Sequence, residues 1–335
     1  MIKVGVIGLG KMGLSHCGII GGLPNVHLEA VCDTSKLVIK AFEKYTKVQC
    51  FKDYMQMIDA TDLDCVIIAI PTKMHAEVVE YSLNKALHVF CEKPFVLDVE
   101  DGVKLTDLAE SKGLISQVGF HNRYVGTFNK MRVLLTDSVI GDIYHFHAKS
   151  NGPVIVKEKA GNWRAKSSEG GGCLYDYASH VVNLVEYLIA NIDRADGVML
   201  KKIFSKDVED AVYSNLYLEN GISGNLTVNW SDETYRKMST EIMVLGKSGK
   251  IICDAQELKI YLKEPSLKHN LLKGWNTLYI TDTTDNVSFY LRGEEYSSQL
   301  DDFINSINNK NMDGRNNFRK SLSTDFVIKK IRDNG

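Results

Sequence analysis

The first 120 residues alternate short apolar runs with segments of helical spacing. Ile2, Val4 and Val6 alternate with polar or small residues, whereas the run from Cys65 to Ile70 is apolar throughout, as in a strand buried on both faces. Strands are expected within residues 2–7, 28–33, 48–51, 65–70, 88–91 and 114–118, and helices within 12–20, 36–45, 53–58, 74–83 and 99–110. This alternation predicts a doubly wound parallel sheet, which binds ligands beyond the carboxyl ends of its strands.

Beyond Gly119 the spacing changes to that of an antiparallel sheet with helices on one side. Alternating runs occupy residues 143–149, 212–218, 222–230, 240–245, 250–254 and 258–262, with helical spacing in 125–135, 174–189, 296–307 and 321–331. Asn220-Gly221 between two of the runs is a strong hairpin signal, because a type I′ turn needs positive φ at both positions. The sequence therefore predicts two α/β domains, residues 1–121 and 122–335, with the helix at 321–333 as a candidate to pack back on the first domain.

Composition narrows the class of partner. The net charge is −2 without a long single-sign block, which argues against nucleic acid. No apolar run reaches the roughly 18 residues of a membrane span, and the chain opens directly into a strand instead of a signal peptide. The seven cysteines include no C-x-x-C pair and several lie in apolar strands, as reduced core thiols do. These features predict a cytoplasmic protein.

Three glycines follow the first strand in the spacing G-x-G-x-x-G. Gly8 permits the tight turn, Gly10 lets a pyrophosphate approach the backbone, and Gly13 lets the following helix lie close to its strand. The spacing alone also marks ordinary turns, but here it follows a strand, and Asp33 ends a second strand twenty residues after the last glycine. A carboxylate there accepts from the adenosine ribose and repels a 2′-phosphate, which favours NAD. Lys36 is close enough to leave NADP as the alternative.

A second group of residues has the chemistry of carbinol oxidation, which needs a hydride acceptor and a base for the hydroxyl proton. The imidazole of His180 titrates near neutral pH, at roughly 6.5 when unperturbed. Asp176 lies four residues earlier on the same expected helix, so both side chains share one face, where a simple surface contact is the alternative. Lys93, at the end of a strand, can donate to the reacting oxygen. These three residues are the catalytic candidates, and either His180 or Lys93 could carry the proton.

Four further motifs accompany the glycine turn: Pro71-Thr72-x-x-His75, Glu92-Lys93-Pro94, the run from Gly119 to Tyr124, and Gly170-Gly-Gly-Cys-Leu-Tyr-Asp-Tyr-Ala-Ser-His180. Together they closely resemble the Gfo/Idh/MocA oxidoreductases over essentially the whole chain. The resemblance implies a Rossmann domain followed by an α/β domain with an open, mostly antiparallel sheet. It also implies NAD(P)-linked oxidation or reduction of a sugar, cyclitol or nucleotide-sugar, and a homodimer or homotetramer formed through the second sheet.

The resemblance also assigns contacts. The expected cofactor contacts are Gly8, Gly10, Lys11, Met12, Gly13, Asp33, Pro71, Thr72, His75, Glu92 and Lys93. The expected substrate contacts are Arg123, Tyr124, Trp163, Arg164, Asp176 and His180. Trp163 and Arg164 could instead form a packing anchor, and Arg123 and Tyr124 a domain-junction contact. The chain departs from the family at Lys73, where Asn is frequent, and at Ala178, where Gly is frequent.

Other signals carry less weight. His145 and His147 share one face of a strand, but no cysteine or acidic cluster is near, so no metal site is expected. His16 and Cys17 are adjacent on a helix and diverge by about 100°, which argues against a nucleophile–base pair. Lys93-Pro94 is a candidate cis bond. Redox-assisted glycoside hydrolysis with NAD retained, and a non-catalytic dinucleotide-binding regulator, remain the rival functions.

Overall fold

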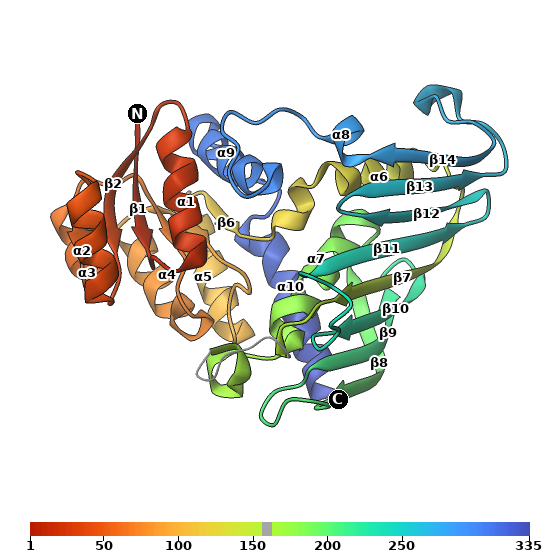
Figure 1. Ribbon diagram of the computed structural model, residues 1–335, viewed down its shortest axis with the longest axis horizontal. Helices are drawn as coiled ribbons and strands as arrows, with labels where there is room; N and C mark the ends of the chain where they lie inside the picture. Colours follow the sequence, from red (N-terminus) through yellow and green to blue (C-terminus); the bar gives the residue numbers. More distant parts are fainter. Residues whose placement is uncertain (156–162) are drawn as a thin grey trace. The chain divides into compact units, whose positions relative to one another are not determined.

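The computed structural model describes residues 1–155 and 163–335, and the chain divides into two compact units (Figure 1). One unit comprises Met1–His121 with Asn286–Leu322, and the other comprises Asn122–Asp285 with Ser323–Gly335. The sequence placed residues 122–335 in the second domain and named the helix at 321–333 as a candidate to pack back on the first. In the structure, α9 (Glu294–Asn309) and the first turn of α10 (Phe318–Asp333) fold with the first unit.

The first unit is built on a six-stranded sheet in which every pair of neighbouring strands is parallel, as predicted. Its strands are β1 (Ile2–Ile7), β2 (Val26–Cys32), β3 (Gln49–Phe51), β4 (Cys65–Ile68), β5 (His88–Cys91) and β6 (Ser116–Val118). The order β3-β2-β1-β4-β5-β6 reverses direction between β1 and β4. Open α/β sheets bind ligands at such a switch point, beyond the carboxyl ends of the strands.

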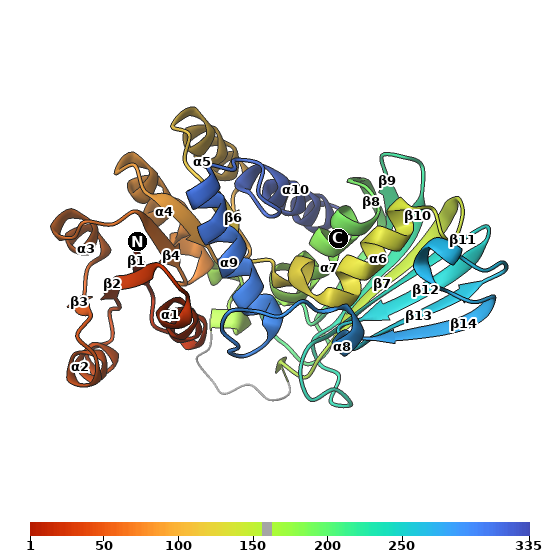
Figure 2. The ribbon, with the colours of Figure 1, turned by 90° about the horizontal axis from the view of Figure 1, so that it is seen from above.

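Helices cover both faces of this sheet (Figure 2). They are α1 (Lys11–Gly22), α2 (Lys36–Tyr45), α3 (Tyr54–Ala60), α4 (His75–Asn84) and α5 (Val99–Ser111), together with α9 and the start of α10. On one face Ile19 of α1, Phe90 of β5 and Phe303 of α9 share a core. On the other face, residues of α3, α4 and α5 pack with Phe318 and Leu322 of α10. This apolar burial is why the late segment belongs to the first unit.

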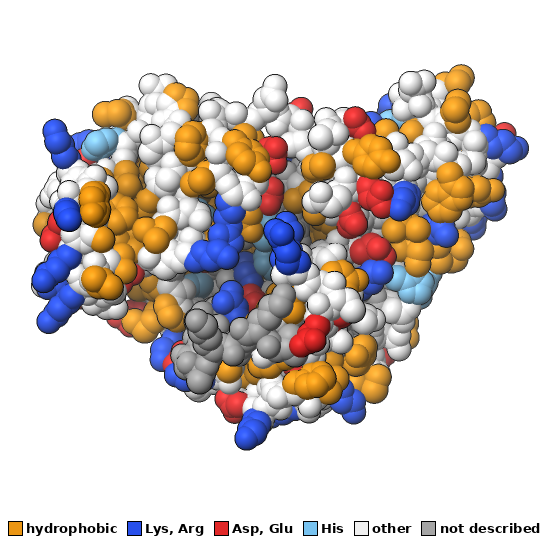
Figure 3. Space-filling view, in the orientation of Figure 1, with side chains coloured by type: hydrophobic (Ala, Val, Ile, Leu, Met, Phe, Trp, Pro, Cys, Tyr) orange, Lys and Arg blue, Asp and Glu red, His pale blue; other side chains and the backbone are white. Residues whose placement is uncertain are grey.

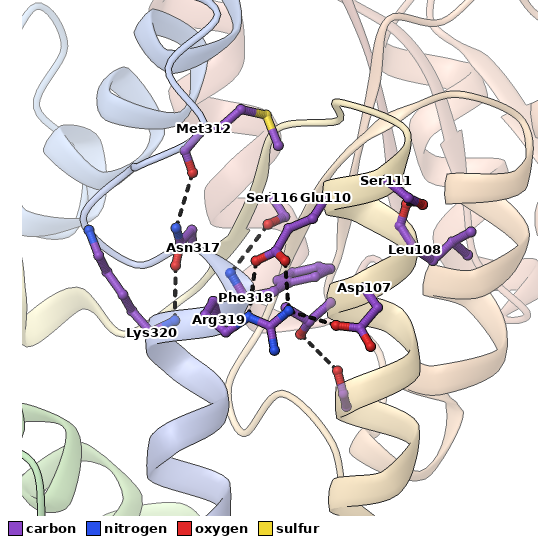
Figure 4. Close-up of polar contacts among 12 residues, drawn as sticks. Asp107, Leu108, Glu110, Ser111, Ser116, Met312, Asn317, Phe318, Arg319 and Lys320 are labelled. Carbon is purple, nitrogen blue, oxygen red and sulfur yellow. Dashed lines mark hydrogen bonds and ion pairs between the residues drawn. The ribbon is translucent and has the colours of Figure 1, made fainter.

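The first turn of α10 also makes polar contacts with α5 (Figure 4). Arg319 Nε donates to Glu110 at 3.0 Å and Nη2 donates to Asp107 at 2.6 Å. The Arg319 side chain is 48% exposed, so each of these ion pairs contributes less than about 1 kcal/mol. The adjacent Phe318 is fully buried with its ring centroid 4.1 Å from that of Phe95. Burial of Phe318 therefore dominates the attachment of this turn.

The second unit contains an eight-stranded mixed sheet. Its strands are β7 (Ile143–Asn151), β8 (Ile192–Lys201), β9 (Ala211–Leu218), β10 (Ser223–Asn229), β11 (Ser239–Gly246), β12 (Gly249–Asp254), β13 (Glu257–Leu262) and β14 (Gly274–Tyr279). In the order β14-β13-β12-β11-β7-β10-β9-β8, β7 and β10 are parallel and the remaining described pairs are antiparallel. The predicted hairpin is present, with Gly221 at φ +83°.

Helices lie over one face of this sheet and leave the other face open (Figures 1 and 2). They are α6 (Gly126–Thr136), α7 (Ser179–Leu188), the short α8 (Ile280–Thr283) and the rest of α10.

Short helical turns in the two units occupy Thr72–Met74, His121–Tyr124, Trp163–Ala165, Ser167–Glu169 and Leu267–His269. Across residues 1–155 and 163–335, every helix is too short or too polar to cross a lipid bilayer.

The alternating apolar side chains of β9 and β10 face the helices rather than the open side of the sheet. Leu216, Leu218, Leu226 and Val228 are buried in the core under the helices, and Ile222 packs against that core. Successive side chains of a strand point to opposite faces, so the open face carries their neighbours instead. In the space-filling view, apolar, histidine and charged side chains intermingle over this face, at β7 and β11–β14 (Figure 3).

Candidate active site

The glycine turn between β1 and α1 has the shape of a dinucleotide site. Gly8 adopts φ +92°, which L side chains rarely allow, and a Cβ on Gly13 would overlap the carbonyl oxygen of Gly8. A Cβ on Gly10, by contrast, would meet no atom within 4 Å. Gly10 is the N-cap of α1 and no side chain caps this helix, so its first amides point to open space where an anion can bind.

Asp33 follows β2 directly and its carboxylate is fixed by backbone amides. Oδ2 accepts from the Leu9 amide of the glycine turn at 2.6 Å, and Oδ1 accepts from the Ser35 amide at 2.7 Å. A carboxylate offers about four acceptor positions, so each oxygen retains one for a ribose hydroxyl. The geometry of the turn and of Asp33 therefore fits NAD.

The preference for NAD over NADP can be tested through Asp33. We expect the wild-type protein to bind NADH at least about tenfold more tightly than NADPH, because the carboxylate accepts from a 2′-hydroxyl and repels a 2′-phosphate. Asp33→Ser should narrow or reverse this ratio, while Lys40→Ala, at an exposed position of α2, serves as the neighbouring control. Dissociation constants from protein fluorescence would measure both, and tighter NADPH binding by the wild type would contradict the assignment.

The loop after β4 brings Pro71, Thr72 and His75 to the same edge of the sheet. Pro71 is exposed and Thr72 is buried. His75 is fully buried; Nδ1 lies 3.1 Å from the carbonyl oxygens of Pro94 and Phe95, and Nε2 lies 3.0 Å from that of Ile70. Burial lowers the pKa of His75 despite these carbonyls. Its ring ties the Pro71 loop to the segment after β5 and so fixes the loop for which cofactor contacts are expected.

Glu92 and Lys93 follow β5 at the carboxyl edge, and the Lys93-Pro94 bond is cis, which confirms that prediction. Glu92 Oε1 lies 2.7 Å from Nε2 of His16, whose ring is fully buried in α1. Burial would raise the pKa of the Glu92 carboxyl, but the hydrogen bond from His16 and the electrostatic interactions with His16 and Lys93 outweigh burial and lower it. Glu92 is therefore an ionised acceptor beside Lys93.

His121 completes this edge of the first unit. Its ring stacks on Tyr296 of α9 with a centroid separation of 4.7 Å. Burial is the largest effect on His121 and lowers its pKa to about 4, with the nearby charges of Lys93 and Arg292 acting in the same direction and Glu92 opposing them. His121 is thus a neutral, stacked ring at neutral pH.

In the second unit, Asp176 and His180 lie at the start of the central helix. The sequence predicted a regular helix from residue 174, whereas Leu174–Ala178 is a π-helical turn that continues into α7. Such wide turns often occur at functional sites. Asp176 is 6% exposed and His180 is 3% exposed, so both are held within the unit rather than on its surface.

Asp176 forms an ion pair with Arg164, whose Nε lies 3.1 Å from Oδ2. Arg164 is 38% exposed, so its guanidinium reaches from solvent to the buried carboxylate. Its neighbour Trp163 is also expected to contact the substrate, but the Trp163 side chain is not among the parts of the chain that the structure describes. The pairing brings two of the expected substrate residues together, although they stand on different elements.

The triple-glycine run closes tightly on its surroundings. A Cβ on Gly171 would overlap the carbonyl oxygen of Arg164. Gly172, at φ +106°, lies so close to the Glu209 carboxylate that a Cβ would overlap it. Glu209 in turn accepts from the Leu174 amide at 2.9 Å, and burial raises the pKa of this carboxyl. Glycine is therefore required where the backbone turns into the helix that carries Asp176.

Arg123 and Tyr124, for which a substrate contact or a domain-junction contact was expected, belong to the second unit. Both are buried, and Arg123 donates from Nε to Asn183 Oδ1 at 2.7 Å and from Nη2 to the Asn183 carbonyl at 3.2 Å. Burial lowers the pKa of Arg123 to about 10, and its guanidinium lies 5.2 Å from the ring centroid of Tyr187. The guanidinium is thus committed to α7 within the second unit.

Two further histidines lie on the open sheet face. His145 Nδ1 lies 3.2 Å from Ser223 Oγ and Nε2 lies 3.1 Å from Asn225 Oδ1, while His147 is exposed on the same strand. Among the described residues, no group of three or more His, Cys, Asp or Glu side chains is arranged to hold a metal ion.

Sequence reasoning missed two residues that shape these sites. His16 was considered only with Cys17, although its position three residues after Gly13 places it on the inward face of α1. Glu209 gave no local signal, because its contact with Gly172 joins positions far apart in the chain.

The fold and the glycine turn define a dinucleotide-binding α/β protein with a second, sheet-based domain. Residues 2–120 match an oxidoreductase family with an NAD-binding Rossmann fold, and residues 128–252 match the GFO/IDH/MocA C-terminal domain. The chain therefore belongs to the Gfo/Idh/MocA family of oxidoreductases, as its motifs indicated.

Among its relatives, the chain is 29% identical over 205 residues to glucose-6-phosphate 3-dehydrogenase of Bacillus subtilis (strain 168), a match that covers 60% of this chain and 57% of that protein. It is 26% identical over 270 residues to 2,7-anhydro-N-acetylneuraminate hydratase of Escherichia coli (strain K12), with 77% and 68% covered. A solved structure of levoglucosan dehydrogenase with NADH and levoglucosan has a TM-score of 0.87 at 19% identity, covering 99% of this chain and 96% of that one. The first match thus spans less than two thirds of the relative, and the structural likeness concerns the fold.

Proposed function

We propose that this chain is an NAD-dependent oxidoreductase that transfers a hydride between nicotinamide and a carbinol or ketone of a sugar, cyclitol or nucleotide-sugar. The observation that carries the proposal is the placement of Lys93 directly after β5, beside the ionised Glu92 and on the ligand-binding edge of a sheet whose glycine turn fits NAD. Asp176 and His180, buried at a π-helical turn, supply the second set of catalytic groups.

Each residue has a defined role in this proposal. Bound NAD supplies the hydride acceptor, and NADH returns the hydride in the reverse direction. Lys93 donates a hydrogen bond to the reacting oxygen and stabilises negative charge that develops on it. His180 takes the hydroxyl proton during oxidation and returns it during reduction. Asp176, held by Arg164, binds a substrate hydroxyl or orients the imidazole. Lys93 is the alternative carrier of this proton.

The relatives support a sugar-like substrate. One is named for the oxidation of glucose 6-phosphate, and the structure of levoglucosan dehydrogenase was solved with levoglucosan bound. A sugar carbinol also suits the polar donors and acceptors of Lys93, Asp176 and His180. Arg164 adds a cation that can contact a charged substituent.

A second candidate function is redox-assisted chemistry in which NAD is reduced and then reoxidised on the same substrate. The relative named as a hydratase favours it, since that name describes no net oxidation. Such a reaction would change the substrate without accumulating NADH. A regulator that binds NAD without catalysis is the remaining rival, and the joint presence of Lys93, Asp176 and His180 argues against it.

The proposed function is tested by supplying NAD and a panel of sugars, inositols and nucleotide-sugars. We expect NADH absorbance to rise with at least one of them, together with the matching ketone in product analysis. Product without net NADH would select the redox-assisted reaction. If the protein binds NAD but forms no product with any compound of the panel, both the dehydrogenase and the redox-assisted hypothesis are rejected, and a non-catalytic NAD-binding regulator is favoured.

The open face of the second sheet supports a homodimer or homotetramer. One row across it joins Leu245, Lys250, Tyr261 and Trp275 on four adjacent strands. Tyr261 is 39% and Trp275 is 56% exposed, and their ring centroids are 5.5 Å apart. Exposed aromatic side chains on a broad sheet favour association, and a second copy of the chain offers the same surface.

We expect light scattering to give a mass at least twice that of one chain. Trp275→Glu should lower this mass, because it buries a charge at an interface without a partner. Leu37→Glu, at an 80% exposed position of α2 in the first unit, should not change it. A monomeric wild-type protein would contradict the proposal.

The proposed location is the cytoplasm. Burial raises the pKa of Cys17 to about 12, with its backbone hydrogen bond opposing the change, and that of Cys32 to about 12, with nearby carboxylates adding to it. Such protonated core thiols suit a reducing compartment.

A further inference from the structure

The further inference concerns His16, which the proposed catalysis does not use. His16 lies in the second turn of α1, fully buried, with its ring edge-on to Phe90 at a centroid distance of 5.3 Å. Its Nε2 lies 2.7 Å from Glu92 Oε1. Its Nδ1 is buried and meets no hydrogen-bond partner among the described residues, so the proton shared with Glu92 is the one on Nε2.

The partner carboxylate is confined on its other side as well. Glu92 Oε2 lies 3.3 Å from the Lys93 amide, and a Cβ on Gly119 would be 3.0 Å from the same oxygen. The Glu92 side chain retains 13% exposure, so the carboxylate is held from behind while part of it faces outward. The hydrogen bond from His16 thus fixes which way this carboxylate is turned.

Two parts of α1 face the expected cofactor. Its uncapped first turn offers amides for the diphosphate, and His16, one turn later, orients the residue that precedes Lys93. We propose that His16 is a positioning residue for the nicotinamide half of the cofactor, acting through Glu92, which it holds as an oriented acceptor for the nicotinamide ribose. The inference rests on the cofactor contact proposed for Glu92 and extends it to a residue that cannot itself reach solvent.

This role predicts that a substitution of His16 changes the affinity for NADH but not the affinity for ADP. NADH contains the nicotinamide half, whereas ADP contains only the part bound by the glycine turn and Asp33. Losing one charge-assisted hydrogen bond should weaken NADH binding by roughly tenfold in His16→Asn, with ADP binding unchanged within about twofold. His16→Gln should retain most of the NADH affinity, because its amide nitrogen reaches about as far as Nε2 whereas that of Asn does not. Titration calorimetry of the substrate-free protein measures both ligands.

A double-mutant cycle separates this role from general packing. Glu92→Gln alone should weaken NADH binding to a similar extent, and adding His16→Asn to it should cause no further loss, since both changes remove the same contact. The proposal is overturned if His16→Asn weakens NADH and ADP equally, if Gln and Asn at position 16 behave alike, or if the two losses multiply. Because no substrate is added, these outcomes are independent of whether the chain proves to be a dehydrogenase.

Discussion

Replacing Lys93 with alanine, or His180 with alanine, is expected to lower kcat by about 10²- to 10⁴-fold while leaving NADH affinity largely unchanged. Lys93 would no longer donate to the reacting oxygen, and without His180 no imidazole would move the hydroxyl proton. Neither residue belongs to the glycine turn or to the Asp33 contacts that we propose to bind the adenosine half. Steady-state kinetics on the active substrate, with NADH titrations of the same preparations, measure both quantities.

Two substitutions provide matched controls for this experiment. Lys104→Ala removes an exposed lysine from α5, and His27→Ala removes an exposed histidine from β2. Both should leave kcat within about threefold, since surface changes of this kind have small effects. Near wild-type turnover in Lys93→Ala or in His180→Ala would remove that residue from the mechanism. A full pH profile of the surviving variant would then show which group carries the proton.

Gly13→Ala and Gly10→Ala are expected to differ sharply, although both change one glycine of the same turn. The methyl group at residue 13 would overlap the Gly8 carbonyl oxygen, so α1 would have to move away from β1. We expect a loss of several kcal/mol of folding stability, as for other steric overpacking, together with loss of NADH binding. The methyl group at residue 10 meets no atom within 4 Å, and φ −66° suits alanine.

Gly10→Ala should therefore keep its melting temperature within a few degrees of the wild type, yet weaken NADH binding by about tenfold or more, because the methyl group fills the space needed by the pyrophosphate. Thermal unfolding and NADH titration of both variants make the comparison. Wild-type NADH affinity in Gly10→Ala would show that the phosphates do not approach the turn at residue 10.

The sequence predicted the elements whose patterns are local and strong. The parallel sheet was readable because its strands are short apolar runs ended by glycine, proline or charged residues, and the hairpin at Gly221 because of its turn chemistry. β8 and β14 were missed. Both lie at the edges of the second sheet, where exposed residues such as Arg194, Asp196 and Trp275 replace the apolar alternation of central strands.

The position of a site residue could be predicted where a local motif locates it. It could not be predicted where contacts with a distant segment of the chain determine its setting. Lys93 and Asp33 stand at strand ends that the pattern located. The buried setting of Arg123 depends on Asn183 of α7, and the ties of His75 depend on carbonyls of the segment after β5. No local pattern encodes such contacts. For the same reason the attachment of α9 to the first unit was not foreseen, since its core partners Phe90 and Ile19 lie more than two hundred residues earlier in the chain.

That attachment has a consequence for how the protein is made. The chain passes between the two units at residues 121–122, 285–286 and 322–323. The NAD-binding unit is therefore begun first and finished after nearly the whole of the second unit has left the ribosome. Until Phe303 and Phe318 emerge, apolar side chains on both sides of its sheet stay uncovered. The nascent NAD-binding unit is thus an incomplete fold for most of translation, and a chain that stops early leaves it without its last layer.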